Sequence, residues 1–150
     1  MNLKFSDEEI DSAIRKNSRS SSMILDLKNT ASWIPDEKLF YARENKNKIE
    51  LARIKTPFTA LLPTIIITFK KDDLQKPRLR LSFFGYLLFS LLLIMVLYIL
   101  LKKVFDDFEG DIFSATFILL FFFSLLFCEF LLTKKTYNKL ERRMFSNKTS

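Results

Sequence analysis

The sequence has no histidine, one cysteine and only two glycines among its 150 residues. Without histidine, no serine or cysteine can be activated by an imidazole base, and the commonest metal ligand is missing. The single cysteine, Cys128, can form neither an intramolecular disulfide nor a cysteine-based zinc site. The chain also contains no catalytic, metal-binding or nucleotide-binding motif. We therefore expect a protein that is not an enzyme and that holds no cofactor.

Two long apolar runs dominate the second half of the chain, at residues 81–101 and 112–133. Each contains 15 Leu, Ile, Val and Phe residues. A helix of this length spans a hydrocarbon layer of about 30 Å, and insertion into a bilayer gains about 5–9 kcal/mol for each run. Burial of both helices in a soluble core is disfavoured, because a chain this short has too little other apolar material to surround them. Residues 81–133 are predicted to form a transmembrane helical hairpin.

Positive charge is concentrated on one side of this hairpin. Five Lys and Arg residues lie at positions 70–80 and five more at positions 134–143, whereas the connecting loop has two lysines against four acids. Because Lys and Arg collect on the cytoplasmic side, a multi-pass protein of the cell membrane with both termini in the cytoplasm is predicted. Residues 1–22 lack an apolar central run, so we expect no cleavable signal peptide, and the first apolar run is the predicted targeting signal.

The first 22 residues predict an amphipathic helix and a serine-rich linker. Ser6 and Glu9 have the spacing of a capping box, and the helix is expected to end near Asn17, before the linker at residues 18–22. Its polar face is acidic rather than basic, so we expect it to cover a small sheet rather than to lie on a lipid surface. The apolar stripe of this helix consists of Ile10, Ala13 and Ile14.

Residues 23–80 predict a small antiparallel β-rich domain on the cytoplasmic side. A polar turn separates apolar segments at 39–42 and 49–54, which is the pattern of a hairpin. The β-branched run at 64–68 predicts another strand, and alternation at 78–81 predicts a last strand that runs directly into the first apolar run. The expected core residues are Trp33, Phe40, Leu51, Phe58, Ile65, Ile67 and Phe69.

The second apolar run is expected to continue as one helix to about Met144, within a basic cytoplasmic tail at residues 134–150. The cations of the tail are expected to fix the topology, and each can attract anionic lipid by about 1 kcal/mol. Nucleic-acid binding is not expected, because no base-reading module accompanies them. The fold class expected is an α+β membrane protein, with an N-terminal helix and β-rich domain before the hairpin. The apolar face of the tail helix consists of Phe130, Tyr137, Leu140 and Met144.

Glu129 is the only formally charged residue inside either apolar run. A carboxylate at mid-bilayer costs up to about 3 kcal/mol, so Glu129 is the main candidate for a functional residue in the hairpin. One interpretation is an interfacial carboxylate that pairs with Arg80 or Lys134 or extends toward water. The others are a proton or cation relay, and a contact between helices or between copies of the chain. The acidic loop at 106–111 offers oxygen ligands for a hard cation, but topology explains its charge and no metal site is predicted.

From Lys48 onward, the layout resembles that of small bacterial two-span membrane proteins with an N-terminal β-rich cytoplasmic domain. In these, a run like residues 53–67, with Leu62-Pro63 at its centre, is followed by an Arg-containing strand, two spans and a charged helical tail. The chain is also similar to small bacterial PH-like membrane proteins, but there the helical hairpin precedes the β-rich part. The resemblance implies a membrane protein and carries over no catalytic residue.

Two functional hypotheses follow from the sequence. The first is a non-enzymatic, membrane-anchored binding or accessory subunit, of which an immunity protein that acts by contact is one version. Its expected partners are the lipid bilayer, with anionic lipid at the basic flanks, and another protein or a second copy of the chain. The alternative is an oligomeric transport or channel component that uses Glu129 within the helix bundle.

Overall fold

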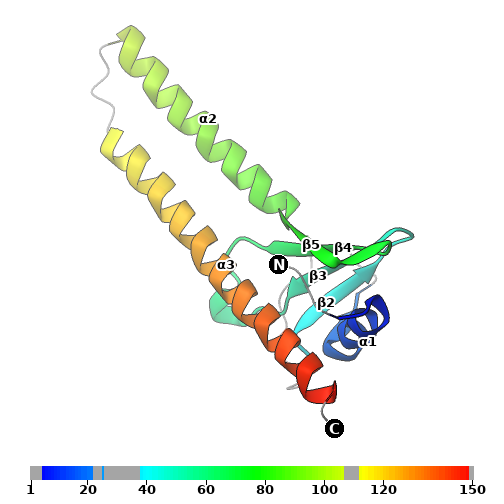
Figure 1. Ribbon diagram of the computed structural model, residues 1–150. Helices are drawn as coiled ribbons and strands as arrows, with labels where there is room; N and C mark the ends of the chain where they lie inside the picture. The colour runs from blue at the N-terminus through cyan, green and yellow to red at the C-terminus, as the bar shows by residue number, and fades with distance from the viewer. Residues whose placement is uncertain (1–4, 22–24, 26–37, 107–111, 149–150) are drawn as a thin grey trace.

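The computed structural model describes residues 5–21, 25, 38–106 and 112–148, which form an α+β structure with a five-stranded mixed sheet and three α-helices. Two of the helices are long and apolar, and both extend away from the sheet (Figure 1). The third, α1, packs beside the sheet near the C-terminal end of the chain. The expected α+β class is confirmed, but the sheet is mixed rather than purely antiparallel.

Helix α1 covers Asp7–Asn17 and begins with the predicted capping box. The Ser6 amide donates to Glu9 Oε2 at 2.9 Å, and the Glu9 amide donates to Ser6 Oγ at 3.3 Å. These two bonds satisfy backbone donors that the first turn of a helix leaves unpaired. The stripe that begins at Ile10 is buried against the sheet, so the expectation that this helix covers a sheet is confirmed.

The sheet has the strand order β1-β2-β3-β4-β5, and each strand pairs with its neighbours in sequence. The predicted hairpin is present as β2 (Phe40–Glu44) and β3 (Lys48–Arg53), and β4 (Ile65–Lys70) and β5 (Asp73–Leu81) continue it in antiparallel register. Strand β1 (Ser18–Ser20) lies where the sequence predicts a linker, and it pairs in parallel with β2. This parallel pair makes the sheet mixed.

Strand β1 forms because α1 ends in a way that directs the chain onto the sheet edge. The Asn17 side chain donates to the Ala13 carbonyl at 3.0 Å, and Ser18 Oγ donates to the Ile14 carbonyl at 2.6 Å, so both close the last turn of α1. The Leu39 amide then donates to the Asn17 carbonyl at 2.8 Å, which brings β2 alongside. A serine-rich composition alone does not reveal this pairing.

Helix α2 (Phe83–Asp106) follows β5 after a single residue, Ser82, as the sequence predicts. The Ser82 amide donates to the Thr64 carbonyl at 2.8 Å, while Ser82 Oγ accepts from the Gly85 amide at 3.2 Å. Ser82 therefore ends the sheet and caps the helix at once. The helix begins two residues later than the predicted apolar run, because Leu81 still pairs with Ile65 in the sheet.

Helix α3 covers Ile112–Lys148 and continues past the apolar run as one element, as predicted. The stretches at 83–102 of α2 and 116–146 of α3 are long and apolar enough to cross a membrane. Only 6 % of the most apolar window of α2 and 17 % of that of α3 is buried, whereas a core helix of a soluble protein would be mostly buried.

The two helices touch through Phe89, whose ring centroid lies 6.1 Å from those of Phe122 and Phe123.

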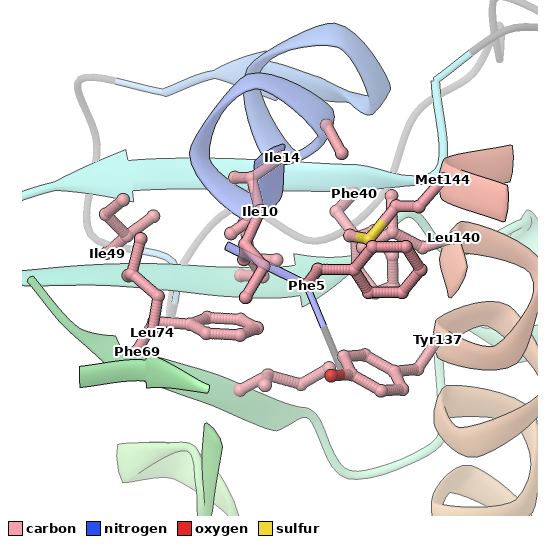
Figure 2. Close-up of a cluster of buried hydrophobic side chains, with 13 residues drawn as sticks. Phe5, Ile10, Ile14, Phe40, Ile49, Phe69, Leu74, Tyr137, Leu140 and Met144 are labelled. Atoms are coloured by element: carbon pink, nitrogen blue, oxygen red, sulfur yellow. The ribbon is translucent and has the colours of Figure 1, made fainter. Parts of the chain in front are cut away.

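The main hydrophobic core lies between α1, the sheet and the last turns of α3. In Figure 2, the side chains of Ile10 and Ile14 from α1, Phe69 from the sheet, and Tyr137 and Leu140 from α3 point into the same cluster. Helix α3 is thus part of the domain core as well as of the apolar pair. The buried members of this cluster are Phe5, Ile10, Ala13, Ile14, Phe40, Ile49, Leu51, Ile67, Phe69, Leu74, Tyr137, Leu140 and Met144.

Most of the predicted core is confirmed, since Phe40, Leu51, Ile65, Ile67 and Phe69 are all buried. The prediction for Phe58 is wrong, because its side chain is 97 % exposed. Pro57 starts a short 3-10 helix, η1 (Pro57–Thr59), that lifts this segment out of the sheet. Trp33 lies outside the described residues.

Candidate functional site

One face of α3 docks on the sheet. The buried residues of its second half recur every three or four positions, which places them on a single stripe. The stripe begins with two polar residues and ends with apolar ones. Its members are Glu129, Thr133, Tyr137, Leu140 and Met144.

Glu129 is fully buried at the top of this stripe and forms an ion pair with Arg53 of β3. Arg53 Nη2 donates to Glu129 Oε2 at 2.6 Å, and Arg53 Nε donates to Oε1 at 3.4 Å. Thr133 Oγ1, one turn further along α3, donates to Oε1 at 3.3 Å. Both carboxylate oxygens are therefore hydrogen-bonded, which is the condition under which a buried charge is tolerated.

Arg53 points toward α3 because of its place in β3. Alternate residues of a strand lie on the same face, so Arg53 shares a face with Leu51 and Ile49, which are both in the main core. Arg53 is not among the residues to which the sequence alone draws attention. Its alternation with two core residues was the available signal, because an arginine on a buried face requires an acidic partner.

Lys55 lies two residues beyond Arg53 and is also fully buried. Its Nζ donates to the Leu62 carbonyl and, at 2.9 Å, to Thr64 Oγ1. Burial lowers the pKa of Lys55 to about 8, the Glu129 carboxylate counteracts this effect, and the Arg53 guanidinium adds to it. The junction between sheet and helix therefore contains two buried cations and one buried anion, so an excess of positive charge is buried here.

The structure assigns different places to the two predicted partners of Glu129. The interpretation in which Arg80 pairs with Glu129 is wrong, because Arg80 Nη2 lies 3.2 Å from Glu50 Oε1 on the opposite face of the sheet. Lys48 Nζ also approaches that Glu50 oxygen, at 2.7 Å. Lys134 lies on α3 next to the Glu129 stripe, but its side chain is exposed and lines a cavity.

This cavity, the basic cavity, has a volume of about 740 Å³ and lies between α3 and the start of β2 and the end of β3. The described residues that line it include no carboxylate. Its apolar wall is formed by Leu39, Ile54 and Leu131. The cations that line it are Lys38, Arg53, Lys134, Lys135, Lys139 and Arg142.

The described residues contain no cluster of three or more His, Cys, Asp or Glu side chains that could hold a metal ion. The acidic loop considered as a cation site falls largely at residues 107–111, outside the described residues. What the site can do chemically is bind an anion through the exposed cations and hold α3 on the sheet through the Arg53–Glu129 pair.

Comparison with family models, with curated proteins and with solved structures gives no match to this chain.

Proposed function

We propose that the chain is a non-enzymatic integral membrane protein, in which α2 and α3 cross the bilayer and the α+β domain lies on the cytoplasmic side as a binding or accessory module. The observation that carries this proposal is the exposure of the apolar stretches of both helices beyond a domain whose core is completed by the last turns of α3. Rings such as Phe117 and Phe127 are 63 % and 60 % exposed, which is unfavourable in water and favourable against lipid.

Topology follows from the cations at the sheet end of the hairpin. The domain and the basic turns of α3 lie at the same end of the two helices, so a cytoplasmic domain also places these Lys and Arg residues in the cytoplasm (Figure 1). The loop between α2 and α3, with four acids and two lysines at residues 102–111, then lies outside.

Extraction and cysteine labelling test the proposal in intact cells. Cys128 is replaced by serine, and single cysteines are introduced at the exposed Asn47, at the exposed Ser146 and at Gly110 in the loop. The protein is expected to remain in membranes after alkaline carbonate washing. An impermeant maleimide is expected to label only the cysteine at position 110, and labelling at 47 or 146 would overturn the orientation.

The binding or accessory role is supported by the way in which the domain is fixed to the membrane helix. The buried pair and the shared core hold the sheet on α3, so the domain presents its surface in a fixed orientation to a partner at the membrane. An immunity protein that neutralises a toxin by contact remains one version of this role.

The alternative role, a channel or transport component, requires Glu129 to face an aqueous path. Its carboxylate is instead paired with Arg53 from the sheet, which disfavours a relay. The test is proton and cation flux through liposomes that contain the full chain. Accessory function predicts no flux, and a flux that is lost in the Arg53→Met/Glu129→Leu double variant would favour the channel.

A further inference from the structure

We propose that the basic cavity binds the phosphate headgroup of an anionic phospholipid. This inference rests on the proposed insertion of α2 and α3 into a membrane, and it adds a defined lipid site to it. The cavity volume of about 740 Å³ lies within the range of roughly 300–1,000 Å³ that is usual for small-molecule sites.

The basic cavity is lined by positive charges that a bound anion would neutralise. Lys134, Lys135, Lys139 and Arg142 are exposed, and none of them forms a salt bridge with an acidic residue in the part of the chain that the structure describes. The only acid of α3 beyond Glu129 is Glu141, which does not line the cavity. Like charges gathered around one hollow repel each other, and a bound phosphate relieves this repulsion.

Arg53 and Lys38, the other two cations, are held in place by the fold. Arg53 is fixed by Glu129, and Lys38 Nζ donates to the Lys16 carbonyl at the end of α1 at 2.6 Å. The cavity therefore combines four exposed cations on α3 with Lys38 and the Glu129-paired Arg53, which are held in place on the sheet side, and this is the arrangement of a site rather than of a uniformly charged surface.

The position of the cavity favours a lipid over a soluble phosphate. Leu131 forms part of its wall at the point where the apolar stretch of α3 gives way to lysines. Cys128 is exposed one turn earlier on the same face, and Leu120 is exposed three turns earlier. A headgroup in the cavity can thus place its acyl chains along this apolar face of α3, within the bilayer.

Two other grooves beside α3 are apolar and differ in this respect from the basic cavity. One is lined mainly by Leu81, Phe123 and Phe127, and the other mainly by Ile67, Phe130 and Tyr137, with a single cation at each. Among the described residues, cations therefore gather at the basic cavity and not along α3 in general.

The test uses the full chain, purified in a neutral detergent and titrated with short-chain phosphatidylglycerol, with phosphatidylcholine or with inorganic phosphate. Lipid retention is measured by native mass spectrometry, and binding by the shift in melting temperature. Phosphatidylglycerol is expected to bind at least about tenfold more tightly than phosphatidylcholine. Inorganic phosphate is expected to give a smaller shift, since it lacks acyl chains.

A matched pair of triple variants locates the site. The first replaces Lys135, Lys139 and Arg142 with glutamine. The second makes the same change at Lys70, Lys76 and Arg78, which are exposed cations of β4 and β5, and of these Lys76 lies 3.5 Å from Asp73. The first is expected to weaken phosphatidylglycerol binding by roughly a hundredfold, since each cation near an anionic headgroup contributes about fivefold. The second is expected to change it by less than about threefold.

Each other outcome overturns a specific part of the inference. Equal losses in the two triple variants would indicate attraction by overall charge and not a site. An equal shift with inorganic phosphate would indicate a soluble ligand. A protein that resists carbonate extraction but does not prefer phosphatidylglycerol would overturn the lipid site and leave the proposed membrane function intact, whereas release by carbonate would overturn the latter.

Discussion

Helices α2 and α3 are similar in apolar character but are attached to the sheet in opposite ways. Helix α2 follows β5 after one residue, yet Gly85 is its only buried residue among those whose burial the structure describes. Helix α3 is remote from the strands in sequence, yet it buries a stripe from Glu129 to Met144 against the sheet and α1. Covalent continuity places α2, while side-chain packing and one ion pair place α3.

Because only α3 packs on the sheet through a buried stripe, side chains of α3 supply most of the stability of the junction between the helices and the sheet. A connection through the backbone survives any side-chain replacement, whereas a packed stripe depends on each buried member. Substitutions on α3 are therefore expected to loosen the domain, and equivalent ones on α2 are not.

The largest effect is expected at the buried pair. Glu129→Leu leaves Arg53 buried without a counter-charge, which costs about 3–5 kcal/mol of the free energy of unfolding. The Arg53→Met/Glu129→Leu double variant is expected to recover most of this loss, because two apolar side chains can replace a buried pair. Thermal unfolding of the detergent-solubilised chain measures both, and Glu141→Leu on the same helix serves as the control. A double variant as unstable as Glu129→Leu would contradict the pairing.

A smaller loss is expected when packing on α3 is reduced. Leu140 is fully buried, so Leu140→Ala should cost about 2–5 kcal/mol. Leu93 of α2 is 48 % exposed, and Leu93→Ala should change stability by less than about 0.5 kcal/mol. The two variants remove the same atoms from the two helices, so equal melting temperatures would show that α3 is not docked as described.

Lys55 gives the junction a pH dependence. The pKa of Lys55 in the folded chain, about 8, lies below its ordinary value of 10.5. Between these values the unfolded chain binds more protons than the folded one, so stability rises with pH in this window, and the cost of burying the charge is fully present below pH 8. Relative to Lys55→Met, the wild type should gain about 1–2 kcal/mol between pH 8 and 9.5.

Replacement of the exposed Lys46 by methionine is the control for this measurement, because it removes the same charge away from the junction. A difference between wild type and Lys55→Met that does not change with pH would mean that the ammonium group is hydrated in solution.

The smallest effect is expected at Tyr137. Its hydroxyl is buried and has no hydrogen-bond partner among the described residues. Tyr137→Phe removes an unsatisfied polar group and keeps the ring, so stability should stay constant or rise by up to about 1 kcal/mol. Tyr98→Phe on α2, where the side chain is 58 % exposed, should have no effect. A clear loss at Tyr137 would show that the hydroxyl has a partner in the protein.

Local rules predicted much of the fold. The capping box at Ser6, the β2–β3 hairpin, the strand that feeds into α2 and the length of α3 all follow from short-range patterns that have a single structural solution. The prediction that Phe58 is buried is wrong for a local reason too, because an aromatic residue after Pro57 fits a turn as well as a strand.

The candidate site was only partly predictable. Glu129 stands out in the sequence because a charge in an apolar run is costly. The sequence indicates as partners only Lys134, which is a neighbour along the helix, and Arg80, which lies at the start of the first span. The true partner, Arg53, is separated from Glu129 by 76 positions and is brought near only by the docking of α3 on β3. The buried stripe of α3 begins with Glu129 and Thr133. A pattern of apolar residues alone begins at Phe130 and leaves these two out, because both are polar residues that are buried with hydrogen-bond partners.

The position of Tyr137, Leu140 and Met144 in the core has a consequence for biosynthesis. A ribosome makes residues 5–81 before either apolar helix, so α1 and the five strands leave the exit tunnel while the last three members of their core do not yet exist. Under the proposed topology, α3 must also return across the bilayer. Until then, Phe5, Phe40 and Phe69 are not covered by the side chains of α3. Under that topology, completion of the domain requires insertion of the whole hairpin, and a chain stalled after α2 leaves an apolar surface of the domain uncovered.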